Sequence, residues 1–532
     1  MHVRGRQRML CKSGTVRGFG IAAYSTGEDV SPMNAALTPI VCQKNSLRLS
    51  RRRILEGAAS WAALASVQGC GYTSNYIYTP PSGSPLPVIP GPVAQASLTV
   101  TAIPSGTIPP RFMGLSYEKS AMTYSYFHVS NRHLIALFRR LGDSVLRIGG
   151  ASVDQVMWTP DATGTHSQVT PVEIKALAGF LQATGWLCLY GVNFATSTPA
   201  QAAEEVAYAV SVLGSNLLGI EIGNEPDEYG IPGNFFAANW TFEDYLARWN
   251  LFRSAILQSA PHVSITGPAT GGGNHLTTWT LPFGQAVTAT EITLLTQHYY
   301  RDYYASGGSP TAAFLLSPDS QLTGELALLN AGAQQLGIPY RISECNSFDN
   351  GGVPGVSNSY ASSLWVIDFL FDVALGGSTG VNMHGGGRSP GYTPIADDDG
   401  GVVEVRPEYY GLLLFTLAGR GTLLETQLSA GTVDATAYAV RTVTGGLNLV
   451  VVNKDTQQNL ILTIATNQNI QLATLQTMTG ASLAATSGVT IQGATVNSDG
   501  SFFPASPGTL TPAGTQTTCF IPALTAALIS IT

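Results

Sequence analysis

Two glutamates carry the chemistry to which this sequence points, and each follows a short apolar run. Glu225 lies in Asn224-Glu225-Pro226, and Glu344 ends a second run with the same design. Pro226 cannot donate a backbone hydrogen bond to a neighbouring strand, so it marks the end of its strand. Reactive groups of parallel barrels lie at the carboxyl ends of the strands. Two such carboxyl groups are what cleavage of a glycosidic bond requires.

The spacing of the two glutamates suits a retaining mechanism. In a retaining glycosidase one carboxyl group is protonated and the other ionised, and they lie about 5–5.5 Å apart. The ends of the fourth and seventh strands of a barrel face each other across its mouth, so Glu225 and Glu344 can approach that closely. Asn224, directly before Glu225, is suited to bind the sugar hydroxyl next to the reacting carbon.

The sequence pattern around these residues predicts a parallel barrel. Short apolar runs alternate with amphipathic helical segments, which is typical of βα units. We therefore predict a (β/α)8 TIM barrel over residues 96–405. A doubly wound open sheet is the alternative, but Gly149-Gly150 lacks the glycine spacing of its phosphate-binding turn. The expected barrel strands are Phe112–Glu118, Ser144–Gly150, Leu187–Asn193, Leu218–Glu225, His262–Ala269, Glu291–Tyr300, Tyr340–Glu344 and Gly380–His384.

The pattern of apolar and polar residues changes over residues 406–532. After one more helical segment, Thr- and Val-rich alternation with many turn residues predicts an antiparallel β-sandwich. The strand expected over residues 96–107 is a candidate to join it, so that both ends of the chain would build one domain. The expected C-terminal strands include Thr436–Val440, Leu447–Val452, Leu460–Thr466 and Leu524–Ile531.

Charge is divided unevenly along the 532 residues. Residues 1–70 carry ten Lys or Arg and three Asp or Glu, whereas the rest carries 16 basic and 30 acidic residues. A body with a net charge of −14 is not expected to bind nucleic acid or an anionic membrane surface.

The first 70 residues resemble an export signal. Arg51-Arg52-Arg53 precedes a short apolar segment, Gly57–Gly69, which is the pattern of a twin-arginine signal. The segment is too short for a transmembrane helix, and an ordinary basic tail is the alternative. Cys70 is a candidate lipid anchor, and the Pro- and Ser-rich residues 71–95 read as a linker. We expect a periplasmic, cell-surface or secreted protein.

Cysteine usage does not indicate a metal site. Beyond Cys70 the chain has Cys188, Cys345 and Cys519, an odd number without ligand-like spacing. We expect no disulfide framework, no metal and no other cofactor.

An ordered set of motifs resembles glycoside hydrolase family 79, the family of heparanase and bacterial β-glucuronidases. Asn-Glu-Pro with a later strand-end Glu is common to a large clan of barrel glycosidases, whereas the full set is more specific. The resemblance implies a retaining β-glucuronidase-like hydrolase that acts on a carbohydrate. The further matching segments are Gly114–Glu118, Leu146–Gly150, Gln297–Tyr300, Ser343-Glu344, Met383–Gly386 and Tyr392–Pro394.

Carried over residue by residue, the resemblance assigns roles within the site. It makes Glu225 the acid/base and Glu344 the nucleophile, and it implies that Tyr299 orients Glu344 by a hydrogen bond. The residues that it places around the sugar are Glu118, Asn224, His384 and, near the C6 group, Tyr392, with Asp154 as a further candidate.

One loop departs from the family. After the nucleophile the family has a tyrosine that holds the uronate carboxylate together with glycine N–H groups. Asp349 stands there in this chain, while Gly351 and Gly352 are retained. An ionised Asp would repel a uronate unless Arg388 offsets its charge, but it can accept a hydrogen bond from a neutral sugar. The alternatives are therefore a β-glycosidase for neutral sugars and a non-catalytic carbohydrate-binding surface protein, which would not need both glutamates.

Overall fold

A computed structural model describes residues 91–161, 165–302, 310–389, 391–399 and 401–532 of the chain. The expected export signal, the candidate anchor Cys70 and most of the linker lie outside these residues. No helix within the described ranges is long and apolar enough to cross a membrane. The described chain forms a (β/α)8 barrel and an eleven-stranded sheet.

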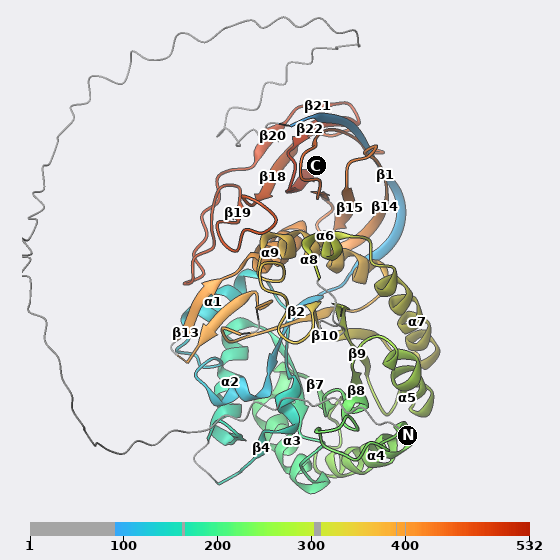
Figure 1. The fold of residues 1–532 in the computed structure, drawn as a ribbon, viewed down its shortest axis with the longest axis vertical. Helices are drawn as coiled ribbons and strands as arrows, with labels where there is room; N and C mark the ends of the chain where they lie inside the picture. Colours follow the sequence, from blue (N-terminus) through green and yellow to red (C-terminus); the bar gives the residue numbers. More distant parts are fainter. Residues whose placement is uncertain (1–90, 162–164, 303–309, 390, 400) are drawn as a thin grey trace, which may run out of the picture. The chain divides into compact units, whose positions relative to one another are not determined.

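Eight parallel strands close the barrel in the order β10-β11-β2-β3-β6-β7-β8-β9. Strands β2, β7, β8, β9 and β10 are labelled in Figure 1. All eight predicted strands are present, which confirms the predicted barrel. Their ends differ by a few residues, and the difference matters at β7, because Asn224 and Glu225 lie in the turn beyond the strand. The bounds are β2 (Met113–Glu118), β3 (Val145–Gly149), β6 (Leu187–Val192), β7 (Leu217–Ile222), β8 (Ile265–Thr270), β9 (Leu294–Asp302), β10 (Tyr340–Phe348) and β11 (Val381–Gly385).

The helices that surround the barrel begin at caps visible in the sequence. Thr170 and Thr198 each cap a helix that starts with proline, and each forms a capping box with the third helical residue. The helices are α1 (Arg132–Arg140), α2 (Pro171–Thr184), α3 (Pro199–Leu213), α4 (Phe242–Ser259), α5 (Leu281–Ala286), α6 (Ala312–Leu316), α7 (Ser320–Leu336), α8 (Tyr360–Leu375) and α9 (Pro407–Ala418).

Short elements occupy the loops at both ends of the strands. Their bounds are η1 (Lys119–Thr123), η2 (Ala151–Asp154), β4 (Met157–Trp158), β5 (Gln168–Val169), η3 (Gly214–Asn216), η4 (Pro226–Glu228), η5 (Leu276–Thr280), β12 (Ile395–Asp398) and β13 (Gly401–Val405). Two of them, η1 and η4, directly follow Glu118 and Glu225, so both glutamates stand where a strand gives way to a tight turn.

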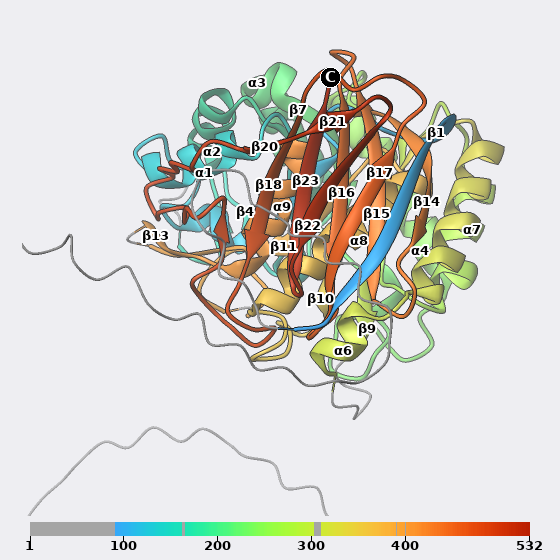
Figure 2. The same cartoon turned by 90° about the horizontal axis from the view of Figure 1, so that it is seen from above.

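The second sheet is built from both ends of the described chain. Strand β1 (Val93–Ile108) pairs with β14 and β17, which confirms that the early strand joins the C-terminal domain (Figure 2). Its pairing with β17 is parallel, whereas the other pairs of this sheet are antiparallel. The barrel between β1 and β17 supplies the long connection that a parallel pair needs.

The sheet has the strand order β19-β18-β23-β16-β15-β14-β1-β17-β22-β21, and β20 pairs with β18. The remaining bounds are β14 (Gly421–Ser429), β15 (Ala435–Thr442), β16 (Leu447–Asn453), β17 (Asn459–Ala465), β18 (Ala473–Thr479), β19 (Thr490–Ile491), β20 (Gly508–Leu510), β21 (Pro512–Ala513), β22 (Gln516–Ile521) and β23 (Thr525–Ile531).

Helix α8 joins the sheet to the barrel. The buried Tyr360 hydroxyl donates to the backbone oxygens of Met478 (3.0 Å) and Leu524 (2.9 Å). Lys454 of the sheet pairs with Asp368 of α8 at 2.9 Å. Because α8 links β10 to β11, the sheet braces the two strands that carry Glu344 and His384.

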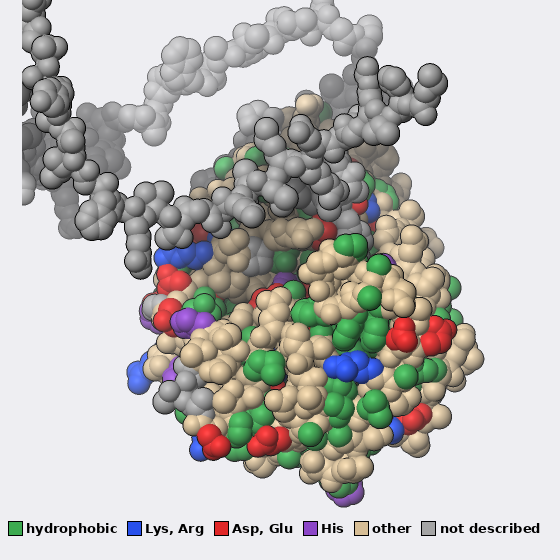
Figure 3. Space-filling view, turned by 60° about the horizontal axis from the view of Figure 1, so that its bottom comes forward, with side chains coloured by type: hydrophobic (Ala, Val, Ile, Leu, Met, Phe, Trp, Pro, Cys, Tyr) green, Lys and Arg blue, Asp and Glu red, His purple; other side chains and the backbone are tan. Residues whose placement is uncertain are grey.

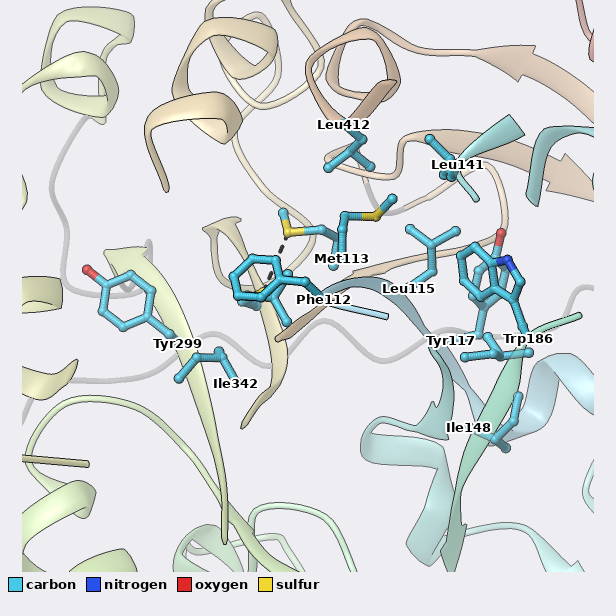
Figure 4. Close-up of a cluster of buried hydrophobic side chains, with 14 of the residues drawn as sticks. Phe112, Met113, Leu115, Tyr117, Leu141, Ile148, Trp186, Tyr299, Ile342 and Leu412 are labelled. Carbon is cyan, nitrogen blue, oxygen red and sulfur yellow. Dashed lines mark hydrogen bonds between the residues drawn. The ribbon is translucent and has the colours of Figure 1, made fainter. Parts of the chain in front are cut away.

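Alternation along the barrel strands separates the core from the site. On β2, Met113, Leu115 and Tyr117 point into a buried cluster that also contains Trp186 and Leu412 (Figure 4). Successive strand residues face opposite sides, so Ser116 and Glu118 face the barrel interior. Burial of each large apolar side chain contributes about 1.5–3 kcal/mol, and this core holds the strand that presents Glu118.

The surface view agrees with the low charge content of the sequence. On the face shown, acidic and basic side chains stand singly or in small groups among uncharged ones (Figure 3). Charged residues make up 11% of the chain.

Candidate active site

Glu344 is held by two donors at the mouth of the barrel. Its carboxylate accepts hydrogen bonds from Arg147 Nη1 (2.7 Å) and from the Tyr300 hydroxyl (2.8 Å). His384 Nδ1 lies 3.6 Å from the same carboxylate. The Glu344 side chain is only 7% exposed. Hydrogen bonds to an ionised group stabilise the ionised form, so this setting favours the carboxylate.

Arg147, on β3, contacts side chains from three other strands of the barrel. Its fully buried guanidinium also pairs with Glu221 Oε2 (2.5 Å), donates to Asn224 Oδ1 (2.8 Å) and donates to Ser116 Oγ (3.2 Å). A buried charge is costly unless it is paired and hydrogen-bonded, and this one has two carboxylate partners. Sequence reasoning missed the role, although one arginine inside the apolar segment Leu146–Gly150 was a signal for it.

Glu225 occupies a turn with an uncommon backbone conformation. Its φ is 48°, in the left-handed region, and it follows Gly223 with φ 84°. Its N–H donates to the Ala269 oxygen at 2.9 Å. The side chain forms a hydrogen bond with His298 Nδ1, also at 2.9 Å. A non-glycine residue in the left-handed region costs conformational energy, and such residues concentrate at functional sites. This conformation fits a turn that presents the Glu225 carboxyl group.

The two glutamates face each other at close range. One oxygen of Glu225, one oxygen of Glu344 and a ring nitrogen of His298 all lie within 4.8 Å of one another. Carboxyl groups in retaining glycosidases are about 5–5.5 Å apart, and in inverting enzymes about 6.5–9.5 Å apart. The spacing therefore fits retention. The same three groups are also the ligand types to which a divalent metal ion could bind.

The environments push the pKa values of the two glutamates apart. Burial raises the pKa of Glu225, and the nearby Glu344 charge adds to the rise against the hydrogen bond with His298. Burial would also raise the pKa of Glu344, but His384, His298 and Arg147, with the Tyr300 hydrogen bond, hold it well below its usual range. Because the two pKa values are shifted in opposite directions, Glu225 is the group that holds the proton and Glu344 is the group that carries the negative charge.

Tyr299 does not orient Glu344, so that prediction was wrong by one residue. The Tyr299 hydroxyl donates to Asp319 Oδ2 at 2.5 Å, and its ring lies in the buried cluster outside the barrel (Figure 4). Strand residues alternate between the two faces, so His298 and Tyr300 point inward instead. The segment Gln297–Tyr300 was recognised, but the face of each residue was not.

Glu118 and His384 line the other side of the site. His384 Nε2 lies 3.6 Å from Glu118 Oε1, and its Nδ1 is 3.1 Å from Ser116 Oγ. Burial alone would lower the pKa of His384, but Glu344 and Glu118 together raise it. Glu118 accepts hydrogen bonds from the N–H (2.8 Å) and hydroxyl of Ser152. Its side chain is still 36% exposed, so a ligand can reach it.

Asp154 was predicted as a candidate to contact the sugar. In the structure it is buried behind the turn that carries Asn224. It is 1% exposed and accepts from the N–H groups of Phe194 (2.8 Å), Ala195 (2.9 Å) and Asn224 (3.2 Å). The Tyr229 hydroxyl is a fourth donor. With its oxygens occupied in this way, Asp154 fixes the turn that carries Asn224.

Tyr392 and the loop after β10 meet on one side of the site. Tyr392 is 4% exposed, and its ring centre is 6.1 Å from that of Tyr300. The Gly391 N–H donates to the Gly351 oxygen at 2.7 Å. A Cβ atom on Gly352 would lie 3.0 Å from the Tyr392 ring, so a side chain there would press on Tyr392. The structure thus brings the predicted loop and Tyr392 together.

Asp349 is the first residue of this loop and is half-buried. Its N–H donates to the Asp302 oxygen (3.3 Å), and its Oδ2 accepts from Asn350 Nδ2 (2.7 Å). Arg388, which sequence analysis considered as an offset to the Asp349 charge, pairs with Asp398 at 2.6 Å.

Comparison with known proteins relates the chain to glycosidases, although no known family model matches it. A β-glucuronidase of Aspergillus niger is 27% identical over 285 residues, which is 45% of this chain and 50% of that protein. A β-glucuronidase of Neurospora crassa is 25% identical over 37% of this chain and 39% of that protein. The matched part of the chain thus spans half or less of these relatives.

Solved structures share the fold over most of the chain. A 4-O-α-L-rhamnosyl-β-D-glucuronidase from Fusarium oxysporum superposes with a TM-score of 0.69 and 19% identity, over 82% of this chain and all of that one. A GH51 arabinofuranosidase from Xanthomonas axonopodis pv. citri gives a TM-score of 0.60 and 14% identity, again over 82% of this chain and all of that one. Both likenesses show the barrel-and-sandwich fold.

Proposed function

We propose that this chain is a retaining β-glycoside hydrolase that acts on β-glucuronides and belongs with glycoside hydrolase family 79. The single observation that carries the proposal is the pair Glu225 and Glu344, with oxygens within 4.8 Å and pKa values shifted in opposite directions. The curated relatives named β-glucuronidase and the ordered set of motifs support the family and the sugar.

In the first step the ionised Glu344 attacks the anomeric carbon while protonated Glu225 gives its proton to the leaving oxygen. The bond to the leaving group breaks, and an ester links the sugar to Glu344. Tyr300 and Arg147 hold the Glu344 carboxylate for this attack, and their donors also keep it from taking up a proton.

In the second step Glu225, now ionised, removes a proton from a water molecule. The water attacks the anomeric carbon, the ester bond breaks, and Glu344 leaves as a carboxylate. Two inversions give net retention. His298, hydrogen-bonded to Glu225, stabilises the ionised form that this step needs.

Asn224 is placed to bind the hydroxyl next to the reacting carbon. Its Oδ1 accepts from Arg147 Nη2, which leaves the amide Nδ2 to donate. A donor at this hydroxyl gains strength as charge develops in the transition state. Arg147 therefore positions two groups at once, the nucleophile and the amide.

Two features of the loop after β10 bear on the C6 group of the sugar. The resemblance implies that Tyr392 and the Gly351 backbone would bind the carboxylate of a uronate. Asp349 in the same loop is the specific observation that favours a neutral sugar, because its charge would oppose a uronate. A β-glycosidase for neutral sugars is thus the second candidate.

A panel of aryl β-glycosides tests the proposal directly. The glucuronide, glucoside and xyloside differ only at C6, so their relative kcat/KM values identify the group that the loop accepts. We expect the glucuronide to be the best substrate, and the Glu344→Gln variant to lose hydrolysis of all three. Glu404→Gln, an exposed glutamate in β13, is the matched control. Binding without hydrolysis of any glycoside would support the non-catalytic alternative.

Export of the chain is a further part of the proposal. The paired arginines Arg51-Arg52 before Gly57–Gly69 motivate it. N-terminal sequencing of the native protein should show a mature chain that begins after Gly69, with a lipid on Cys70 if the cysteine is an anchor. Recovery of residues before Arg51 would contradict export by this signal.

A further inference from the structure

We propose that a groove along helix α1, on the outside of the barrel, binds the carboxylates of an acidic polysaccharide. This second site shares no residue with the site of Glu225 and Glu344. The inference rests on the proposed function for the choice of a uronate as the anion. We call the groove, which has a volume of about 740 Å³, the α1 groove, and its lining includes Arg132, Ala136, Arg139 and Arg140 of α1 and Asp499 and Gly500 of the loop before β20.

The α1 groove is basic, whereas the protein as a whole is acidic. Beyond residue 70 the chain has 16 Lys or Arg and 30 Asp or Glu. Three of those basic residues line the groove, against one acidic residue, Asp499. Charges more than about 8 Å apart are largely screened at physiological ionic strength, so an anion in the groove interacts mainly with the three guanidinium groups. The groove therefore favours an anion in spite of the negative net charge of the protein.

The arginines of the α1 groove form a row. Arg132 and Arg139 are seven residues apart on α1, which is almost two turns, so they lie on one face of the helix, about 10.5 Å apart along its axis. Ala136 lies between them, and Arg140 follows Ala136 by four residues and is thus on the same side. A single small anion meets one end of this row. A polymer that carries carboxylates on repeated sugars meets both ends.

Backbone oxygens hold two of the guanidinium groups in place. Arg139 Nε donates to the Ala183 oxygen at 2.6 Å. Arg140 Nε and Nη2 donate to the Gly500 oxygen at 2.9 and 2.6 Å, and the guanidinium lies 5.3 Å from the centre of the Phe502 ring. Among the described residues, nothing accepts a hydrogen bond from the two Nη groups of Arg139 or from Arg140 Nη1. These donors are available to a carboxylate, which a guanidinium can bind through two hydrogen bonds at once.

The other wall of the α1 groove is a loop of the C-terminal domain that fits closely on α1. Gly500 has φ 79°, in the left-handed region, and a Cβ atom there would lie 2.6 Å from Ala136 Cβ. A glycine is therefore needed for the loop to come this close. The Ser501 N–H donates to Asp499 Oδ1 at 2.8 Å, so the one acidic group of the groove is already engaged within its own loop. The barrel and the C-terminal domain thus build the groove together.

A polyuronate fits the α1 groove better than a nucleic acid does. Proteins that bind single-stranded nucleic acids offer aromatic faces on which the bases stack. No aromatic residue of the described chain lines the groove, and the Phe502 ring beside it faces the Arg140 guanidinium. Ile135 and Ala136 instead supply an uncharged surface between the arginines. A chain of sugars with carboxylates at intervals matches this combination of charged ends and an uncharged middle.

The test measures binding of a soluble polyglucuronate to the full chain with Glu344→Gln, which prevents hydrolysis, while a saturating aryl β-thioglucuronide occupies the catalytic site. We expect binding that weakens as salt is added, and no binding of the same polymer after its carboxyl groups are reduced to alcohols. Adding Arg132→Gln/Arg139→Gln should raise the dissociation constant by about 2- to 30-fold, the combined effect of two exposed ion pairs. The control Arg420→Gln/Arg441→Gln removes the same charge from exposed positions outside the groove and should leave the constant unchanged.

Three results would overturn the inference. Unchanged binding in Arg132→Gln/Arg139→Gln would place the polymer elsewhere, and equal weakening by the control pair would show only an effect of net charge. Binding of a single-stranded DNA as tight as that of the polyglucuronate would contradict the choice of a uronate. If the glucuronide is not hydrolysed by the wild type but the polymer binds in the α1 groove, the proposed function fails and this inference holds. If hydrolysis is found and the groove variant binds as the wild type does, this inference alone fails.

Discussion

Replacing Tyr300 with phenylalanine should disable the nucleophile without removing it. The Tyr300 hydroxyl donates to Glu344 at 2.8 Å inside a buried site. A hydrogen bond to a charged group contributes about 1.5–3 kcal/mol. Its loss should lower kcat/KM by about 10- to 100-fold. Because the bond stabilises the ionised form, its loss also raises the pKa of Glu344, so the acidic limb of the kcat/KM profile should move up by about one to two pH units.

Tyr299→Phe is the matched control on the same strand. Its hydroxyl donates to Asp319 outside the barrel, so the change should lower the free energy of unfolding by about 1–3 kcal/mol and leave the acidic limb in place. The assay is the pH dependence of kcat/KM for an aryl β-glycoside, with urea unfolding of each variant. If Tyr299→Phe shifted the limb and Tyr300→Phe did not, the account of β9 and of Glu344 would be refuted.

Three further changes test the remaining parts of the site. Glu225→Ala should spare substrates with good leaving groups and abolish hydrolysis of poor ones, because only the latter need a proton donor; kcat/KM across a series of aryl glycosides would show this as a steep dependence on the leaving-group pKa. His298→Ala should move the basic limb of the kcat/KM profile to higher pH, since the hydrogen bond from His298 lowers the pKa of Glu225 and its loss keeps the acid protonated longer; a limb that moves down would contradict this. Asp349→Tyr should raise the ratio of glucuronide to glucoside hydrolysis, because two carboxylates about 4 Å apart oppose each other by on the order of 1–4 kcal/mol; an unchanged ratio would mean that other residues bind C6.

The barrel could be predicted because its signals are local. Apolar runs of strand length and helical segments alternate along the chain, and the caps Thr170 and Thr198 mark where helices begin. Glu225 and Glu344 stand out for the same reason, since each lies at the end of such a run. The strand over residues 96–107 could be assigned to the C-terminal sheet by its alternation, but its parallel partner β17 could not be, because nothing in a strand encodes the direction of a neighbour that lies hundreds of residues away.

The parts that failed depend on which face of a strand a residue occupies. Barrel strands are buried on both faces and lack polar alternation, so Gln297–Tyr300 does not reveal that Tyr300 and not Tyr299 points inward. Arg147 meets Glu344 across 197 residues of sequence, a distance over which spacing carries no information. Asp154 was recognised as a carboxylate near the site, but only the structure shows that backbone donors occupy it.

The central claim is that Glu344 forms the covalent bond to the sugar, and labelling with a 2-deoxy-2-fluoro-β-glucuronosyl fluoride tests it most directly. Such a reagent slows breakdown of the glycosyl–enzyme more than its formation, so the adduct accumulates and can be located by mass spectrometry of peptides. We predict one adduct, on Glu344, and none in Glu344→Gln. An adduct on Glu225, or turnover of glucuronides with inversion and no adduct, would contradict the account.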